Sequence, residues 1–461
     1  MAVKLTDLVN YNKWWKGEGW EEEDLDLKKV RFLLKRRMID IPESELTIIR
    51  GVRRSGKTVY LKEIIKNLIE KGIDPRSIMY LSCDRMNRSR TRNIINEFRI
   101  QRGGGYLILD EITYMEDWNL LLKEIMEQGS FTVIATGSNP VGIKHSAERL
   151  PGRGVEGNEY YFDPLSFREF LFAIKQAPED IIDPSLREAV LSAPDIDHSF
   201  PPFSPDIDVL LPFFEEIERL FHHYLLTGGF PNAIVELFLD GKVNTDTYEM
   251  IIRMTLGLIS KEGRKESIAR SIMERLNTIG TGRVDFQTIG KDVEVHHNTV
   301  RDYLDLLEDG RILYVLHQWD LAKKRIKHSK GKKMIFQSSL FPIAFNNYIK
   351  GGQWHQAQEF LDQNKEWLIE GVVASHVIWT LERPLMMEKH AFAGFHAGKK
   401  ECDLVLLQGN DRLLGFETKY GKLQKTDYPF PVTYLTKEES DMDAVPVSLF
   451  LFGLKKGNWS I

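Results

Sequence analysis

The chain has 461 residues, 42% of them hydrophobic and 28% charged, which is typical of a folded globular protein and excludes a disordered or fibrous class. This length predicts roughly three domains. The formal net charge of -5 gives no general attraction to nucleic acid or to an anionic membrane, so any such binding must come from a local patch.

The cysteine content and the apolar runs indicate a protein of the reducing cytoplasm. Cys83 and Cys402 are the two cysteines and have no C-x-x-C spacing, which argues against a disulfide framework or a thiolate zinc site. The N-terminus lacks the apolar core of a signal peptide, and the longest apolar run, VPVSLFLFGL, is about half a membrane span. We therefore expect neither export nor membrane insertion.

Residues 46–163 alternate short apolar runs with helical segments, which is the pattern of a parallel α/β sheet. Between the first two runs, apolar residues repeat with helical spacing over 61–69, and Gly72 stands where a helix C-cap belongs. Strands are expected at 46–49, 78–82, 106–109, 131–135 and 159–162.

A phosphate-binding loop follows the first of these strands. The pattern G-x-x-x-x-G-K-[ST] is met by Gly51, Gly56, Lys57 and Thr58. Such glycines let consecutive backbone N–H groups face an anion, and the helix dipole adds positive potential there. We expect Lys57 to reach the β- and γ-phosphates of ATP and Thr58 to take one Mg²⁺ position. The expected nucleotide contacts are Gly51, Val52, Arg53, Arg54, Ser55, Gly56, Lys57, Thr58 and Val59.

Two later strands end in polar residues. The strand in GGGYLILDEI ends in Asp110, which is expected to hold Mg²⁺ directly or through water, and in Glu111, which is expected to orient or deprotonate the attacking water. The strand in FTVIATGSN ends in Thr136, Ser138 and Asn139 on the side where a ligand should lie. Ser138 is therefore a further candidate for contact with the nucleotide.

The middle of the chain is mostly helical from 164 to about 280, with an acidic, proline-rich surface insertion at 176–208. The following segment, 284–318, predicts a short helix, a turn, an amphipathic helix and a strand, an order that suits a winged helix-turn-helix. The run KKRIKHSKGKKM then packs seven Lys and Arg into twelve residues. In an acidic chain this run is the best signal for binding double-stranded DNA.

Near the C-terminus, the segment ECDLVLLQGNDRLLGFETKYG predicts a hairpin with an acidic face. Asp403 starts one strand, while Glu417 and Lys419 lie two apart on the next and so share a face. Two carboxylates there would bind Mg²⁺, and the lysine would position or activate water for phosphodiester cleavage. Charges that alternate outward on exposed strands produce the same pattern without a site.

Several of these motifs resemble the successive signatures of the AAA-type ATPases of archaea and bacteria, relatives of the STAND signalling ATPases. They are GVRRSGKT, LILDEITYMEDW, VIATGSN, LPGRG, DPLSFREF and TGGFPNAI. The resemblance implies an ATPase core, a winged helix and a C-terminal domain of unknown function. It also implies a role for Arg53, for Arg153 as a finger or sensor or else in a structural salt bridge, and for Gly229 and Pro231 near the nucleotide. Val52 stands where the family usually has proline.

The pattern of Asp403, Glu417 and Lys419 resembles the D…E-x-K core of restriction-endonuclease-like nucleases, with Glu370 matching an acidic residue on the preceding helix. The segment after Lys419 is short for the helix that such a core normally inserts. Fold alone does not supply activity, so cleavage is a separate question from resemblance.

Together these observations predict an α/β P-loop NTPase with a parallel sheet and helical lid, a winged helix-turn-helix, and a C-terminal α+β nuclease-like domain. The expected domains are 1–165, 166–265, 266–333 and 334–461. The expected function is a Mg²⁺-dependent ATPase that couples its nucleotide state to a DNA-binding winged helix and a nuclease-like end. The alternatives are a slowly hydrolysing ATP switch that binds DNA or protein, and an ATP-gated DNA nuclease. A homo-oligomer is left open.

Overall fold

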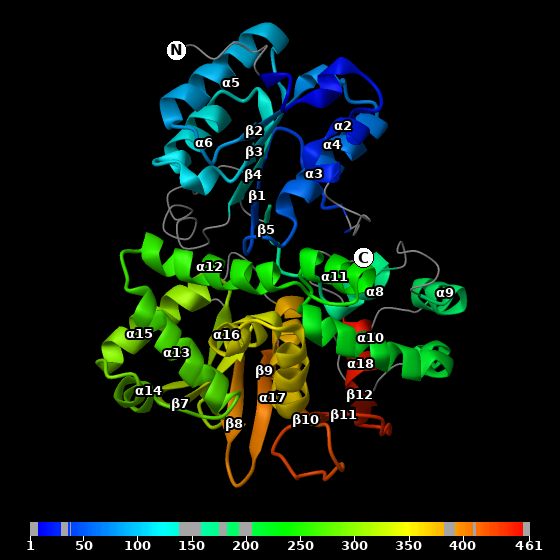
Figure 1. The fold of residues 1–461 in the computed structure, drawn as a ribbon, viewed down its shortest axis with the longest axis vertical. Helices are drawn as coiled ribbons and strands as arrows, with labels where there is room; N and C mark the ends of the chain where they lie inside the picture. The colour runs from blue at the N-terminus through cyan, green and yellow to red at the C-terminus, as the bar shows by residue number, and fades with distance from the viewer. Residues whose placement is uncertain are drawn as a thin grey trace. The chain divides into compact units, whose positions relative to one another are not determined.

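The computed structural model of the chain describes residues 8–28, 36, 38–137, 158–174, 182–192, 205–381, 392–408 and 412–454. It divides into two compact units, Met1–Asp163 and Pro164–Ile461. Figure 1 shows a sheet with flanking helices in each unit.

The first unit contains a five-stranded sheet in the order β2-β3-β4-β1-β5, and every neighbouring pair is parallel. The α/β class with a parallel sheet is thereby confirmed, and each predicted strand is present to within two residues at either end. The strands are β1 (Leu46–Arg50), β2 (Ile78–Ser82), β3 (Gly105–Asp110), β4 (Phe131–Gly137) and β5 (Glu159–Tyr161).

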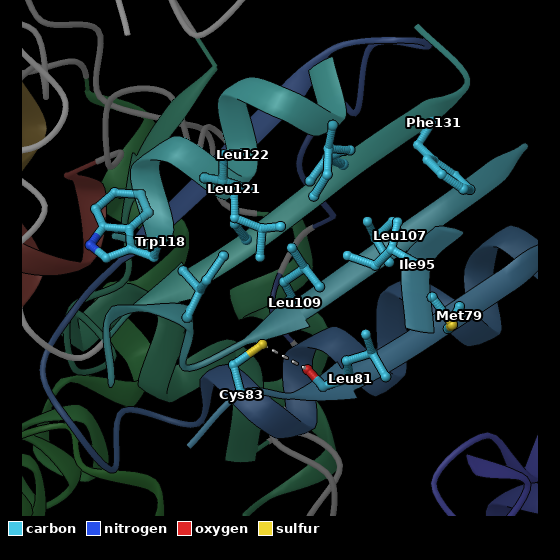
Figure 2. Packing of buried hydrophobic residues seen from close by; sticks show 14 of the residues in the cluster. Met79, Leu81, Cys83, Ile95, Leu107, Leu109, Trp118, Leu121, Leu122 and Phe131 are labelled. Carbon is cyan, nitrogen blue, oxygen red and sulfur yellow. Dashed lines mark hydrogen bonds between the residues drawn. The ribbon is translucent and has the colours of Figure 1, made fainter. Parts of the chain in front are cut away.

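Helices cover this sheet because its strands are apolar on both faces. The helices are α4 (Lys57–Glu70), α5 (Arg88–Arg102) and α6 (Trp118–Glu127), with short turns η2 (Pro75–Ser77) and η3 (Ile112–Tyr114). Figure 2 shows side chains of α6, including Trp118, packed in one buried cluster with Leu107 and Leu109 of β3. This packing holds the carboxyl ends of the strands in place, where the loops that follow them begin.

The N-terminal segment covers the backbone of β2, which is the edge strand of the sheet. It contains η1 (Lys13–Lys16), α2 (Trp20–Glu23) and α3 (Leu25–Lys28). The side-chain amide of Asn12 donates to the Tyr80 carbonyl at 3.1 Å and accepts from the Tyr80 N–H at 2.7 Å. The indole N–H groups of Trp14 and Trp15 both donate to the Ile78 carbonyl, at 3.0 and 2.8 Å. Side chains thus satisfy backbone groups that a further strand would otherwise satisfy.

The second unit combines helices with a seven-stranded mixed sheet in the order β12-β11-β10-β9-β8-β6-β7. Its strands are β6 (Leu313–Asp320), β7 (Arg325–Phe336), β8 (Ala393–Ala397), β9 (Glu401–Gln408), β10 (Arg412–Lys419), β11 (Val432–Thr436) and β12 (Ala444–Pro446). Its helical elements are α8 (Phe167–Ile174), α9 (Pro184–Ser192), η4 (Pro205–Phe213), α10 (Phe214–Thr227), α11 (Pro231–Asp240), α12 (Thr245–Lys261), α13 (Glu266–Ile279), α14 (Phe286–Asp292), α15 (His297–Asp309), α16 (Leu340–Lys350), α17 (Trp354–Leu381) and α18 (Val447–Gly453).

The helices α14 and α15 are followed by β6, which is the predicted order of helix, turn, helix and strand. β6 forms an antiparallel hairpin with β7. The other edge of β6 pairs in parallel with β8, so this hairpin is part of the same sheet as the C-terminal strands. The predicted boundary between residues 333 and 334 therefore falls inside β7. The free edge of a strand can pair with a strand far along the chain, and no local sequence pattern reveals such a pairing. The segments 266–333 and 334–461 share a sheet because β6 pairs with β8 in this way.

The two glycines of TGGFPNAI have a packing role within the second unit. A side chain on Gly229 would place its Cβ 2.1 Å from the Leu165 carbonyl oxygen, and the Leu165 N–H donates to the Gly229 carbonyl at 2.9 Å. The Gly228 carbonyl accepts from the Ser338 hydroxyl at 2.8 Å. Both glycines have positive φ angles, of 55° and 76°, so glycine is needed here for conformation as well as for space.

Candidate functional site

The loop between β1 and α4 is shaped by a close approach and by left-handed residues. A Cβ on Gly51 would lie 2.0 Å from the Phe162 carbonyl oxygen, so only glycine fits. Gly56 has φ of 97° and Arg54 has φ of 66°, and the Ser55 hydroxyl donates to the Val52 carbonyl at 2.9 Å. The loop thus curls at the N-terminus of α4, where backbone N–H groups and the helix dipole favour a bound anion.

Lys57 is the first residue of α4, and its ammonium group is buried inside this loop. It donates to the carbonyls of Gly51 at 3.0 Å and Val52 at 2.9 Å. Its Nζ lies 3.9 Å from Oε1 of Glu111. Burial lowers the pKa of Lys57, while the carboxylates of Glu111 and Asp110 oppose that shift. A phosphate oxygen would provide the negative charge that a buried ammonium group needs.

Asp110 is buried at the end of β3 and is held by three hydroxyl groups. Its Oδ2 accepts from the Thr58 hydroxyl at 2.8 Å and from the Tyr80 hydroxyl, also at 2.8 Å. Its Oδ1 accepts from the Thr136 hydroxyl at 2.5 Å, and Thr136 in turn accepts from the Glu111 N–H at 3.0 Å. These bonds fix the orientation of the carboxylate before any ligand arrives.

These residues fit a Mg²⁺ ion. Mg²⁺ prefers oxygen ligands at about 2.0–2.1 Å in an octahedron, so adjacent ligands lie about 2.9 Å apart. The 2.8 Å separation between the Thr58 and Asp110 oxygens is close to that edge. Thr58 and Asp110 are thus suited to hold the ion together, either directly or with a water in between.

Glu111 adopts a left-handed backbone conformation, with φ of 56°, where β3 ends and η3 begins. This conformation is uncommon for a residue other than glycine, and such strain concentrates at functional positions. It places the Glu111 carboxylate, about one fifth exposed, beside Lys57. Arg53 lies on the outside of the loop, with its guanidinium 5.4 Å from the ring centre of Tyr114, and Arg54 is exposed.

Tyr80 is the functional residue that sequence reasoning missed. It is buried in β2, and its hydroxyl reaches Asp110 on the neighbouring strand. Its one signal in the sequence is an aromatic hydroxyl group between two apolar residues, Met79 and Leu81, of a buried strand. Of the polar residues that end β4, Thr136 is the one seen to contact Asp110. The predicted residues Ser138, Asn139 and Arg153 lie outside the described residues.

A second group of charged side chains gathers in the second unit. Asp403 on β9 lies beside Glu417 and Lys419 on β10, the arrangement expected of the hairpin. Glu370, singled out by the resemblance to nucleases, joins them from α17. The Asp403 N–H donates to Oε2 of Glu417 at 3.2 Å, and Lys419 forms an ion pair with Glu417. We call these four residues the D…E-x-K cluster. Within the described part of the chain, no group of three or more His, Cys, Asp or Glu is arranged to hold a metal ion.

The basic run at 323–334 does not form one exposed patch. Lys323, Lys324 and Arg325 are exposed where β6 turns into β7. Lys332 and Lys333 are buried, and Lys333 forms ion pairs with the D…E-x-K cluster. The predicted nucleic-acid signal therefore reduces to the exposed part of the run, because Lys332 and Lys333 are buried within β7.

Comparison with known proteins identifies two segments. Residues 43–171 match the AAA domain family (AAA_14). This segment is similar in sequence to an AAA domain, and we refer to it below as the AAA domain. The AAA domain ends before a second matched segment, 218–347, which corresponds to a domain of unknown function (DUF8612) and includes α14, α15, β6 and β7.

Similarity to curated proteins extends over most of the chain. The uncharacterized protein MJ1637 of Methanocaldococcus jannaschii is 24% identical and covers 83% of this chain and 77% of its own. An uncharacterized protein of Haemophilus influenzae is 23% identical, and the similarity covers 64% of this chain and 68% of that protein. Among solved structures, the Walker-type ATPase PABY2304 of Pyrococcus abyssi has 13% identity and a TM-score of 0.38, and covers 70% of this chain and 95% of its own. Among the described helices, none is long and apolar enough to cross a membrane.

Proposed function

We propose that the AAA domain binds ATP together with Mg²⁺ and hydrolyses it. The observation that carries the proposal is the pairing of the Thr58 hydroxyl with the Asp110 carboxylate, 2.8 Å apart, beside the buried ammonium group of Lys57. A loop of this shape favours an anion, and a carboxylate beside a hydroxyl offers the oxygen ligands that a hard cation prefers. A nucleoside triphosphate with Mg²⁺ supplies both the anion and the cation.

Each side chain has a distinct part in the proposed reaction. Lys57 donates to oxygens of the β- and γ-phosphates and stabilises the negative charge that builds up there. Thr58 and Asp110 hold Mg²⁺, which when bound neutralises phosphate charge. Glu111 accepts a hydrogen bond from the attacking water and orients it toward the γ-phosphate.

Two substitutions test the proposal, because they separate binding from turnover. Lys57→Ala should abolish ATP binding or hydrolysis, whereas Glu111→Gln should keep ATP bound and lose turnover. Lys66→Ala is a matched control, since Lys66 lies on the same helix with its side chain about half exposed. Hydrolysis is measured as released phosphate, and binding as the dissociation constant of a fluorescent ATP analogue. Turnover in Lys57→Ala equal to that of the wild type would refute the assigned site.

We further propose that the second unit binds double-stranded DNA in a manner that depends on nucleotide. The supporting observation is the exposed basic turn Lys323, Lys324 and Arg325 in the hairpin that follows α14 and α15 along the chain. Helix α15 carries four carboxylates and one arginine, so phosphate contacts are expected from the hairpin turn rather than from this helix. DNA would then stimulate or slow ATP hydrolysis.

The test of DNA binding removes the three charges of the hairpin turn together. Affinity for a DNA duplex, measured by fluorescence anisotropy at two salt concentrations, should fall and its salt dependence should become weaker. Replacing Lys399 and Lys400 on the exposed turn before β9 provides a control with similar charge. If Glu111→Gln still binds DNA and keeps the biological activity, then ATP binding rather than ATP hydrolysis controls the protein, as in a slowly hydrolysing ATP switch. Equal affinity in the triple variant and the wild type would rule out the hairpin turn.

DNA cleavage by the second unit is the remaining function predicted from the sequence. The juxtaposition of Asp403, Glu417 and Lys419 supports a nuclease-like arrangement, while Lys333 among the same carboxylates counts against a metal there. Incubating linear and circular DNA with Mg²⁺ or Mn²⁺ in each nucleotide state tests cleavage, with Glu417→Ala as the control.

A further inference from the structure

All six carboxylate oxygens of the D…E-x-K cluster contact a donor within the protein. In Glu370, Oε1 accepts from Lys333 at 2.8 Å and Oε2 accepts from the Thr281 hydroxyl at 2.6 Å. In Asp403, Oδ1 accepts from Lys333 at 3.2 Å and Oδ2 accepts from the Thr418 N–H at 3.0 Å. The Glu417 oxygens contact Lys419 and the Asp403 N–H, as described above. A metal would have to displace several of these donors.

Lys333 contacts three carboxylates, which lie on two elements of the second unit. Its side chain extends from β7 and is 2% exposed, and its Nζ lies 2.8 Å from Oε1 of Glu370 on α17. It also lies 2.8 Å from Oε1 of Glu401 and 3.2 Å from Oδ1 of Asp403, both on β9. An ammonium group with three carboxylate neighbours at these distances occupies the same kind of position as a bound cation.

We propose that Lys333 is a built-in cation of the D…E-x-K cluster. Together with Lys419, which pairs with Glu417, it neutralises the carboxylates that a restriction-endonuclease-like nuclease would use to hold a divalent metal. The cluster is then an internal ion-pair network that joins the β6–β7 hairpin to α17 and β9. Metal-dependent DNA cleavage is not an activity of the wild-type cluster in this arrangement. The second unit acts by binding rather than by cutting.

The charges of the cluster and its immediate neighbours agree with this assignment. The four carboxylates of Glu370, Glu401, Asp403 and Glu417 face three cations, Lys333, Lys419 and Arg283, the last of which is paired with Glu401 at 3.2 Å. With every group ionised, the four carboxylates and the three cations together carry one net negative charge. Burial alone would lower the pKa of Lys333, but the surrounding carboxylates outweigh it and raise the pKa, so this lysine stays protonated.

Mn²⁺ binding to the full chain without nucleotide tests the proposal, with free Mn²⁺ measured by electron paramagnetic resonance. Because Asp403 holds no metal in the wild type, Asp403→Asn should leave the number of bound Mn²⁺ ions unchanged. Lys333→Met should gain one Mn²⁺ site, and the double variant with Asp403→Asn should lose it again. Lys332→Met is the matched control, since Lys332 is the neighbouring buried lysine of β7 but lies over the ring of Phe286.

Two results would overturn the proposal. The first is a wild-type protein that loses one Mn²⁺ site, or a DNA-cleaving activity, on Asp403→Asn. The second is a Lys333→Met variant that is folded, as judged by circular dichroism, and binds no more Mn²⁺ than the wild type. If Lys333→Met does not fold, the comparison of the wild type with Asp403→Asn still decides whether the cluster holds a metal.

Discussion

Replacing Tyr80 with phenylalanine removes a single hydroxyl group from the AAA domain and keeps the ring in its packed position. The ring remains covered by Lys62, whose Nζ lies 4.0 Å from the ring centre, and the backbone of Tyr80 remains bonded to Asn12. What changes is Oδ2 of Asp110, which loses a hydrogen bond of 2.8 Å. The perturbation therefore acts on the orientation of Asp110.

The size of the expected effect follows from this bond. A hydrogen bond to a charged group contributes about 1.5–3 kcal/mol, and loss of a residue that orients a metal ligand weakens metal binding by about 10- to 100-fold. Tyr80 supplies one of the two hydrogen bonds that Oδ2 accepts, the other coming from the Thr58 hydroxyl. We expect the Mg²⁺ concentration for half-maximal ATP hydrolysis to rise by about tenfold or more. ATP affinity without Mg²⁺ should stay within about twofold, because Lys57 and the loop are untouched.

The assay is a Mg²⁺ titration of ATP hydrolysis at fixed ATP, paired with ATP binding measured in a chelator. Tyr106→Phe is the control, because Tyr106 lies at the opposite end of β3 from Asp110. A variant with normal Mg²⁺ dependence, or one that loses ATP binding in the chelator to the same degree as hydrolysis, would refute the positioning role of Tyr80. If the wild type itself does not hydrolyse ATP, Mn²⁺ binding in the presence of ATP gives the same comparison.

Three further outcomes are expected. Asn12→Ala should lower the free energy of unfolding of the first unit by about 1–3 kcal/mol, seen by urea denaturation, because it leaves backbone groups of buried Tyr80 unpaired. Gly51→Ala should abolish ATP binding, measured by fluorescence titration, since its Cβ would lie 2.0 Å from a backbone oxygen. Burial, followed by Asp403, raises the pKa of Glu370 to about 7 from its ordinary 4.5. Below pH 4.5 Glu370 is protonated in both the folded and the unfolded protein. Between pH 4.5 and 7 the unfolded protein loses this proton while the folded protein keeps it, so the free energy of unfolding should fall by about 1–3 kcal/mol as pH rises toward 7. Glu370→Gln should remove this fall in thermal melting curves recorded from pH 5 to 8.

The parts of the fold predictable from the sequence are those with a local physical cause. The strands of the first sheet and helix α4 follow from apolar periodicity, and the phosphate loop follows from glycine and lysine at a fixed spacing. Tyr80 could not be recognised, because its role depends on β2 lying beside β3, and sheet order is not a local property. Lys333 could not be told from its neighbours in the basic run either. Its burial depends on the pairing of β6 with β8, about 75 residues further along the chain.

The Asn12 amide has a consequence for how the protein behaves in solution. An uncovered edge strand is a template for intermolecular strand addition, the first step toward ordered aggregates. Asn12 offers one donor and one acceptor to Tyr80, which is what another strand would offer, and so this position of the edge is already occupied. Shortening the protein at its N-terminus would uncover β2, and solubility rather than catalysis would be the first property to suffer.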